Sequence, residues 1–418
     1  MNDPQDGSTE LDRTVTRRAV YPVFQPVISL RSGRVAGYEA LARGPAGSEL
    51  RNPAELFAQA QRAGRLTELD WVARAAACRA ALAAGLPWDI PLFVNVEPAT
   101  MGTDCPPGLA ETIETANREL QVVMEITERS LSDDPAALLT SVARVRGRSN
   151  RIALDDVGVN PASLSLLALL SPEIIKLDRH IVQGRPTHET AQVVNAVLAE
   201  SERTGAIILA EGIETERHLA AAISMGATLG QGWLLGRPGP LPGQFERPDT
   251  DLPYSTAPDS GARTPFEVAR RQRRATRATK RQLIPLSNHL ESMSEHAPEA
   301  TVLLGAFQDA SYFTEHTRHR YQAIADKGAL TAAFGRGISA QPAPGIRGGS
   351  LSADDPLTAE WSVIVLGSYF SGGLFARQLP TSARCREADR EFDVIISYDR
   401  SLVAEAARTL LSRLAPIS

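Results

Sequence analysis

The sequence contains few cysteines and no long hydrophobic run. Its three cysteines, Cys78, Cys105 and Cys385, stand far apart, and none belongs to a CxxC pair. This usage argues against a disulfide framework and a thiolate zinc site, and it fits a reducing compartment. No apolar segment approaches the roughly 20 residues needed to cross a bilayer. The acidic, polar N-terminus also lacks the basic and then apolar order of a signal peptide. We therefore expect a cytoplasmic protein that does not enter a membrane.

The sequence also lacks a strong excess of charge of one sign. Lys and Arg number 44 and Asp and Glu number 49, which leaves a net charge of −5. Such a balance gives no general attraction to a nucleic acid polymer, so an anionic ligand would need local cations or bound metal ions. Hydrophobic residues make up 43% of the 418 positions. A full core is possible, and the length suits two domains or one large barrel with an appendage.

Short aliphatic runs alternate with longer helical patterns through the first half of the chain. The strand-like runs are residues 21–30, 33–43, 90–98, 121–128, 151–158, 173–178, 206–214 and 227–235. Alternation of this kind predicts an α/β fold with a mostly parallel sheet, and the number of runs suits a closed (β/α)8 TIM-like barrel. The first two runs are separated by a very short turn, which predicts a hairpin. One strand of the barrel is therefore expected to be antiparallel.

Polar and charged side chains stand at the ends of these runs. They are Glu39, Asn95, Glu125, Asp155, Asp156, Lys176, Asp178, Glu211 and Gln231. Any one acid alone could be a helix cap or a solvated loop residue. A barrel, however, gathers the carboxyl ends of its strands on one face, so residues distant in sequence would share one cavity. Carboxylate and amide oxygens suit Mg²⁺ or Mn²⁺, and the absence of His and Cys from the set argues against zinc.

A series of motifs over residues 21–240 resembles a known family. The strings YEALAR, LFVNVEP, MEITE, ALDDVG, IKLD, AEGIET and QGWLLGRP follow one another in the order and spacing of the EAL-domain family. Members of that family are phosphodiesterases of the bacterial second messenger cyclic di-GMP. The resemblance implies metal-dependent hydrolysis of cyclic di-GMP to linear pGpG, two ions of Mg²⁺ or Mn²⁺, and a homodimer.

The same resemblance implies roles for individual residues. The implied metal ligands are Glu39, Asn95, Glu125, Asp155 and Asp156, with Asp155 bridging two ions. Lys176 and Glu211 would position and deprotonate the attacking water, so that Glu211, Lys176, Glu39 and Asp155 form the catalytic set. The implied substrate contacts are Gln25, Arg43, Asp178, Arg179, Glu214, Gln231 and Pro238.

One motif departs from the family pattern. Where the family commonly reads DDFGxGxSSL, this chain reads DDVGVNPASL, with Val157, Asn160, Pro161 and Ala162 as the differences. Proline fixes φ and removes a donor, so a stiffer loop is expected. The glutamate that anchors this loop in the family corresponds to Glu128. Loss of supporting contacts around metal ligands commonly costs about 10–100-fold in affinity or activity. Low or conditional activity, or a barrel that binds cyclic di-GMP as a receptor or scaffold, is therefore the alternative.

The rest of the chain divides around the barrel. Residues 1–18 are poor in apolar side chains, which predicts a disordered N-terminus before a barrel over 19–240. Residues 241–264 are rich in Pro, Gly, Ser and Asp without periodicity, as in a linker. Residues 265–418 alternate strands and helices and predict a second, smaller α/β domain. The basic run 270–281 lacks interleaved aromatics, so we interpret it as a solvated helical face in preference to a surface for nucleic acid or an acidic partner.

Segments of this second domain also resemble a known module. The strings SNHLE, GAFQDASYF and RHRYQAIA are similar to the DICT domain, a sensory module found beside cyclic di-GMP enzymes and two-component proteins. The resemblance implies a regulatory role and an unknown signal or ligand.

Overall fold

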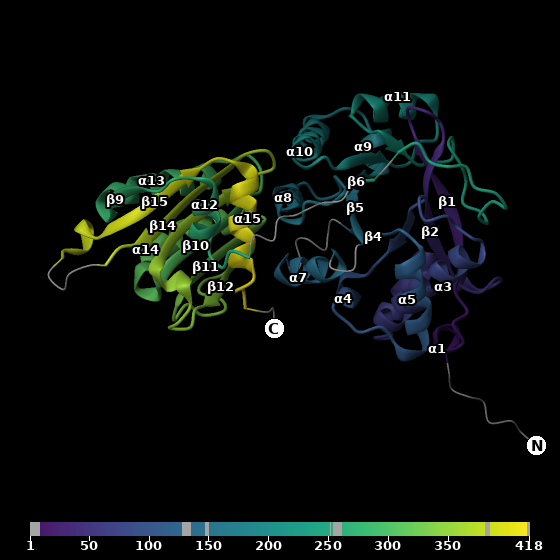
Figure 1. The fold of residues 1–418 in the computed structure, drawn as a ribbon, viewed down its shortest axis with the longest axis horizontal. Helices are drawn as coiled ribbons and strands as arrows, with labels where there is room; N and C mark the ends of the chain where they lie inside the picture. Colours follow the sequence, from purple (N-terminus) through teal and green to yellow (C-terminus); the bar gives the residue numbers. More distant parts are fainter. Residues whose placement is uncertain are drawn as a thin grey trace, which may run out of the picture.

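The structure is a computed structural model of the chain. It describes residues 9–127, 135–146, 150–250, 252–253, 261–380 and 385–415. Figure 1 shows two bodies side by side, a barrel formed by the first half of the chain and a layered sheet formed by the second.

The first body is a closed barrel of strands in chain order. The strands are β1 (Tyr21–Ser29), β2 (Val35–Arg43), β3 (Leu92–Asn95), β4 (Val122–Thr127), β5 (Arg151–Val157), β6 (Ile174–Leu177), β7 (Ile207–Ala210) and β8 (Leu229–Gly230). Strand β1 is antiparallel to both of its neighbours, and all other pairs are parallel. The predicted barrel and its single antiparallel strand are confirmed.

Helices connect the strands around the outside of the barrel. They are α2 (Pro53–Arg62), α3 (Leu66–Ala83), α4 (Pro98–Met101), α5 (Pro107–Glu119), α7 (Pro135–Arg146), α8 (Leu167–Leu170), α9 (Arg179–Gln183), α10 (His188–Thr204) and α11 (Glu216–Ser224), with 3₁₀ turns η1 (Glu49–Arg51) and η2 (Pro161–Leu166). Local sequence sets their ends: the side chain of Asn52 caps α2, and Gly205, at φ +77°, ends α10. Buried side chains such as Phe93, Val123 and Leu209 fill the barrel interior. A site must therefore lie at an end of the barrel.

The N-terminal segment forms a helix, so the prediction of a disordered N-terminus is wrong for residues 9–18. Helix α1 (Glu10–Thr16) begins with a capping box. The Asp12 N–H donates to the side chain of Thr9, and the Thr9 N–H donates to the side chain of Asp12. Leu11 and Val15 are buried in the cluster that contains Trp71. Two apolar residues four positions apart are too short a pattern to predict a helix from sequence. Helix α1 is stabilised instead by its packing against α2 and α3.

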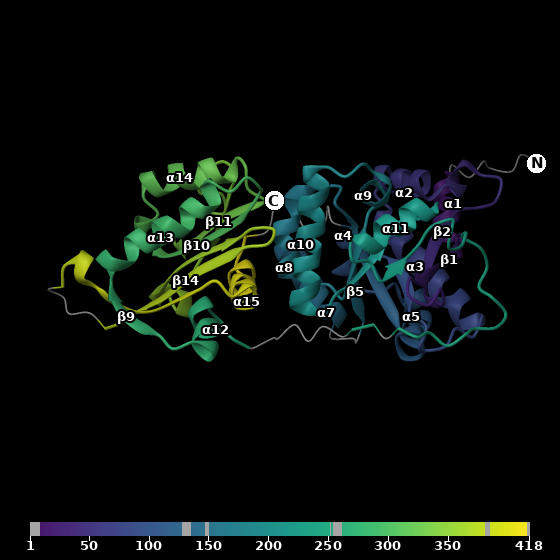
Figure 2. The ribbon, with the colours of Figure 1, turned by 90° about the horizontal axis from the view of Figure 1, so that it is seen from above.

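The second body is a mixed sheet of seven strands in the order β12-β11-β10-β13-β14-β15-β9. They are β9 (Thr276–Thr279), β10 (Val302–Asp309), β11 (Leu330–Arg336), β12 (Ile346–Ser350), β13 (Glu360–Leu366), β14 (Ser371–Gln378) and β15 (Glu391–Ser397). Its helices are α12 (Pro265–Gln272), α13 (Lys280–Glu295), α14 (Glu315–Ala325) and α15 (Arg400–Leu411), with the turns η3 (Ala310–Tyr312), η4 (Pro356–Ala359) and η5 (Glu387–Asp389). Figure 2 shows α13 and α14 over one face of the sheet and α12 and α15 over the other. The predicted α/β fold of this part is confirmed.

The basic run 270–281 differs from the prediction. A single helical face was expected, but the run crosses the end of α12, the edge strand β9 and the start of α13. Thr276–Thr279 pair with β15, and the strand begins and ends with threonine, a β-branched residue that favours strands. The prediction of one helix rested on the charges of this run alone.

Among the residues that the structure describes, no helix combines the length and apolar character needed to span a bilayer.

Candidate active site

Charged side chains from separate strands converge on Lys176 at the carboxyl end of the barrel. The ammonium nitrogen Nζ of Lys176 lies 2.7 Å from Glu125 Oε1 and 2.8 Å from Glu211 Oε1. It lies 3.0 Å from Asp155 Oδ1 and 3.7 Å from Glu39 Oε2. Lys176 is 1% exposed. Acids spread over β2, β4, β5 and the segment after β7 thus share one buried rim.

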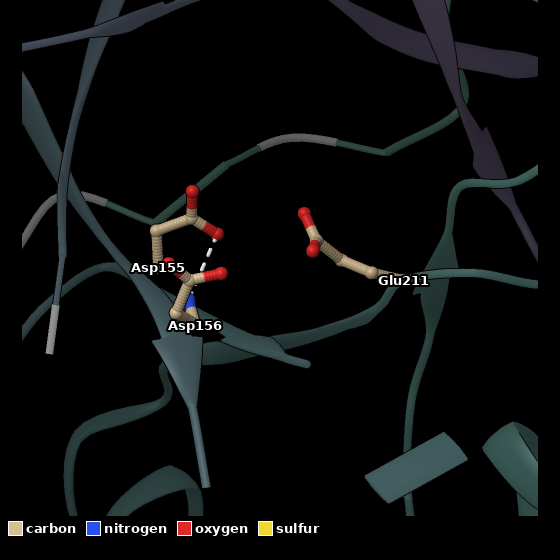
Figure 3. Close-up of side chains that lie close together, drawn as sticks. All are labelled: Asp155, Asp156 and Glu211. Carbon is tan, nitrogen blue, oxygen red and sulfur yellow. Dashed lines mark hydrogen bonds between the residues drawn. The ribbon is translucent and has the colours of Figure 1, made fainter. Parts of the chain in front are cut away.

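Strand β5 delivers two neighbouring acids to this rim. Ile152–Leu154 are buried and hold the strand in the core. Consecutive strand residues normally point to opposite faces, but Asp156 has a left-handed φ of +58°. The Asp156 N–H donates to Asp155 Oδ1 at 3.0 Å. Figure 3 shows both carboxyl groups at the end of β5 with Glu211 opposite. Ligand atoms of these three acids lie within 4.8 Å of one another.

The acids carry more negative charge than Lys176 neutralises. Burial and then the charge of Glu39 raise the pKa of Glu125 well above its ordinary value. Burial, with Asp155 and Glu39 close by, raises the pKa of Glu211 to about 8 against the opposing effect of Lys176. Burial and Asp155 raise the pKa of Asp156 to about 6. The site therefore favours any group that brings further positive charge, either protons or cations.

The donor set fits a hard divalent cation. Glu39, Glu125, Asp155 and Asp156 offer carboxylate oxygens, which Mg²⁺ and Mn²⁺ prefer. The buried atom Oε2 of Glu125 has no hydrogen-bond partner among the described residues. An oxygen in that state is available to a cation. The structure thus supports the chemistry that the strand ends predicted.

Asn95 and Gln231 lie against Glu39. Gln231 Nε2 donates to Glu39 Oε2 at 2.7 Å, and Asn95 Nδ2 donates to Glu39 Oε1 at 3.2 Å. Burial would raise the pKa of Glu39, but Lys176 and these two amides hold it below its ordinary value. Both residues were predicted from the strand ends, and both are next to the acids. In this arrangement Gln231 orients Glu39.

Two other predicted substrate contacts lie next to the acids: Gln25 pairs with Glu39 between β1 and β2, and Asp178 is buried and close enough to Asp156 to help raise the pKa of Asp156. Asp178 caps α9, accepting from the N–H of His180 at 2.7 Å. Arg179 and Glu214 are exposed. Gln25 donates through Nε2 to Gly236 O at 3.0 Å. Pro238, the last of the predicted substrate contacts, is half-buried. Glu128, which was predicted to anchor the loop after β5, lies outside the described residues.

A cavity of about 380 Å³ opens beside the acids, between β2, β3, α2 and α3. Glu39, Asn95 and Arg43 line it, so the predicted substrate residue Arg43 faces the same space as two candidate metal ligands. Other lining residues, including Phe57 and Arg74, were not predicted from the sequence. The sequence did contain an indication of Arg74: Asp70 stands four residues earlier on the same helix, which is the spacing of an ion pair. The pair lies buried at 2.9 Å between Arg74 Nε and Asp70 Oδ2.

The second domain has a cavity of its own. It has a volume of about 280 Å³ and lies between α13, α14 and one face of the sheet. Aromatic side chains line it, namely Phe307, Tyr312, Trp361 and Phe392. Its polar groups include the buried carboxylate of Glu291, to which Arg320 Nε donates at 2.7 Å. Its volume is close to the lower end of the roughly 300–1,000 Å³ of small-molecule sites.

Comparison with known proteins identifies the family of the chain. The model of the EAL domain matches residues 8–238, and the model described as "Sensory domain in DIguanylate Cyclases and Two-component system" matches residues 265–379. The chain belongs to the EAL-domain family and carries a DICT domain after the barrel. Both resemblances seen in the sequence are confirmed.

Relatives in this family include named phosphodiesterases. The chain is 30% identical to the cyclic di-GMP phosphodiesterase RocR of Pseudomonas aeruginosa, over 52% of this chain and 57% of the relative. It is 31% identical to an uncharacterized signaling protein of Caulobacter vibrioides, over 59% of this chain and 30% of the relative. The chain therefore spans less than two thirds of the length of either. A solved structure of Klebsiella pneumoniae BlrP1, titled as a manganese and cy-diGMP complex, has 26% identity over 53% of this chain and 56% of that chain, with a TM-score of 0.47.

Proposed function

We propose that the barrel hydrolyses cyclic di-GMP to linear pGpG with the help of divalent cations. The observation that carries the proposal is the convergence of Glu39, Glu125, Asp155 and Glu211 on Lys176 in one buried rim. The relatives named as cyclic di-GMP phosphodiesterases support the choice of substrate.

The proposed metal ligands are those whose oxygens face the rim. Glu39, Asn95, Glu125, Asp155 and Asp156 would hold Mg²⁺ or Mn²⁺, and two ions suit this number of carboxylates. When bound, the cations would supply positive charge to the phosphodiester oxygens and lower the pKa of the attacking water. The structure supports this assignment through the excess of negative charge and the unpartnered oxygen of Glu125.

Two residues of the chain would handle the proton and the developing charge. Glu211, whose pKa burial raises to about 8 in the metal-free rim, would lose its own proton when the cations bind and would then accept a proton from the attacking water on its carboxylate. Lys176 would hold a fixed positive charge where the phosphoryl group becomes more negative. The water oxygen would bond to phosphorus as one P–O bond to a ribose oxygen breaks, opening the ring to pGpG.

The substrate would extend from the rim into the neighbouring cavity. Arg43 would offer its guanidinium to a phosphate or a guanine edge there. Gln25, Asp178, Arg179, Glu214 and Pro238 are proposed as outer contacts of the second nucleotide, together with Gln231 near Glu39. A homodimer is proposed on the family resemblance alone.

The second domain would regulate the barrel in response to a signal. Its aromatic cavity is the proposed place for a small ligand, and Trp361 within it is the only tryptophan of residues 265–418. We expect ligand binding to change the fluorescence of this domain. Division of the chain into a barrel over 19–240, a linker over 241–264 and a sensory domain over 265–418 is part of the same proposal.

The test is hydrolysis by the full chain. Purified protein with cyclic di-GMP and Mg²⁺ or Mn²⁺ should yield pGpG, and EDTA or the Glu39→Ala substitution should abolish the product. Glu216→Gln, which removes an exposed carboxylate on α11, is the matched control and should retain the activity. Tight binding of cyclic di-GMP without product would overturn the proposal in favour of a receptor.

A further inference from the structure

A bulge in β10 shapes the cavity of the second domain. Phe307 and Gln308 both line this cavity, although consecutive side chains of a regular strand point to opposite faces of the sheet. The pairing of β10 with β11 shifts in register between Ala306 and Asp309, and Gln308 has a left-handed φ of +66°. Bulges re-aim side chains and are common beside functional sites. The strand is therefore bent where the bend brings both side chains to the cavity.

Aromatic side chains give the cavity fixed, flat walls. Phe307, Trp361 and Phe392 stand on β10, β13 and β15, on the face of the sheet that α13 and α14 cover (Figure 2). The rings of Trp361 and Phe392 pack edge to face with centroids 6.0 Å apart. The hydroxyl of Tyr312 accepts from Arg390 Nη1 at 2.6 Å. Walls that are held in this way before a ligand arrives favour a planar ring system.

A buried carboxylate lies at the polar end of the cavity. Glu291 is 2% exposed, and its Oε2 accepts from Arg320 Nε at 2.7 Å. The contacts of its other oxygen, Oε1, are longer: 3.4 Å to the hydroxyl of Tyr321 and 3.5 Å to the hydroxyl of Ser287. Hydrogen bonds between oxygens are normally roughly 2.5–3.0 Å long. Oε1 can therefore accept a shorter hydrogen bond from a ligand.

The charges at this end favour a neutral donor over a cation. Arg320 already supplies a positive charge to the carboxylate of Glu291. Burial raises the pKa of Glu291 against the opposing effect of Arg320, so one more hydrogen bond to the carboxylate would stabilise its charged form. The guanidinium of Arg320 has more N–H donors than this ion pair uses, and it can donate to a carbonyl oxygen of the ligand. The pair thus matches a lactam edge, in which an N–H stands beside a C=O.

We propose that this cavity binds a planar bicyclic heterocycle with a lactam edge, the chemistry that guanine and the pterins share. The lactam N–H donates to Glu291 Oε1, Arg320 donates to the carbonyl oxygen, and the ring lies against Trp361. Proteins read a free base in this way, by stacking it on aromatic side chains and bonding its edge. Arginine is the usual partner of the guanine carbonyl, whereas amide side chains are the usual partners of adenine.

The size of the cavity limits the ligand further. Its volume of about 280 Å³ is small for a ligand site, which suits a single bicyclic ring system in preference to a dinucleotide. The role of this cavity in sensing a signal rests on the proposed function of the second domain, whereas the lactam edge is a new assignment that binding alone can test.

The test is calorimetric titration of the full chain in EDTA with guanosine, inosine and pterin, which share the lactam edge. The negative probes are 1-methylguanosine, in which a methyl group replaces the lactam hydrogen, and adenosine, which lacks the carbonyl. Glu291→Gln removes the charged acceptor, and Trp361→Leu removes an aromatic face. Asp326→Asn is the matched control, because Asp326 is an exposed acid at the end of α14. Circular dichroism verifies the folding of each variant.

We expect saturable binding of the lactam probes, and the tightest of them distinguishes a nucleoside from a free pterin as the source of the ligand. Binding of 1-methylguanosine and of adenosine should be at least about tenfold weaker than that of guanosine, as should binding of guanosine by Glu291→Gln, because a hydrogen bond to a charged group is lost. Trp361→Leu should also weaken binding by about tenfold, through the loss of stacking. Asp326→Asn should match the wild type.

Three results would overturn the inference: no saturable binding of any lactam probe, equal affinity for guanosine and 1-methylguanosine, or unchanged affinity in Glu291→Gln. The comparison of the two nucleosides uses the wild type, so it holds even where a variant does not fold. A chain that forms pGpG but binds none of the lactam probes would refute this assignment and leave the proposed hydrolysis standing. Binding that depends on Glu291 in a chain that forms no pGpG would refute the proposed hydrolysis and support the assignment.

Discussion

Replacing Lys176 by Met should destabilise the metal-free barrel, and divalent cations should reverse the effect. The substitution keeps the volume of the side chain but removes the buried cation that contacts four carboxylates at 2.7–3.7 Å. Removing one partner of a buried ion pair costs roughly 3–5 kcal/mol of unfolding free energy. We expect the lower end, about 3 kcal/mol, because Glu125 and Glu211 have raised pKa values and can take up protons.

The assay is urea unfolding of the full chain at pH 7, with EDTA and with excess Mn²⁺. Saturation at 100 times the dissociation constant adds about 2.7 kcal/mol to the stability of the form that binds. Mn²⁺ should therefore return most of the stability that Lys176→Met removes. The control is Lys327→Met, which alters an exposed lysine and should change stability little. Equal stability of Lys176→Met and Lys327→Met in EDTA, or no effect of Mn²⁺, would refute the reasoning.

Three further predictions concern the same rim. Glu211→Gln should slow hydrolysis by roughly 10²–10⁴-fold, the usual contribution of a general base, while cyclic di-GMP still binds. The control Glu216→Gln should stay active. Full activity of Glu211→Gln would contradict the role of Glu211 as the general base. Mn²⁺ affinity should rise from pH 6 to pH 8, because Glu211 and Asp156, with pKa values of about 8 and 6, must lose protons to act as ligands or a base. Calorimetry in buffers of different ionisation enthalpy measures the protons released, and an affinity independent of pH would contradict the assignment. Gly158→Ala should lower the unfolding free energy by roughly 1–3 kcal/mol, since φ is +106° and the new Cβ would come within 2.6 Å of a side-chain carbon. Gly239→Ala, where a Cβ meets no atom within 4 Å, should be close to neutral in the same unfolding assay.

The sequence predicted the rim because a barrel follows simple rules of pattern. Runs of aliphatic residues marked the strands, and the topology of a closed barrel brings their carboxyl ends together. Glu39, Glu125, Asp155 and Glu211 could therefore be placed near one another before any coordinates were known. Their positions relative to Lys176 confirm that arrangement, while their roles in metal binding and catalysis stay proposals.

Features set by tertiary contacts could not be predicted in this way. The left-handed backbone of Asp156 is visible only in three dimensions, although it determines that both acids of the pair reach the rim. Helix α1 depends on a surface supplied by α2 and α3. Arg408 of α15 in the second domain donates to the carbonyl oxygen of Ala168 in α8, which joins residues about 240 positions apart, and no local pattern marks such a pair.

The central claim is that the buried acids at the end of the barrel hold divalent cations, and titration of Mn²⁺ into the metal-free chain tests it most directly. Calorimetry at pH 8 should show saturable binding of two ions in the wild type, lost or reduced to one ion in Asp155→Asn. The absence of saturable binding, or identical binding by Asp155→Asn, would contradict the account.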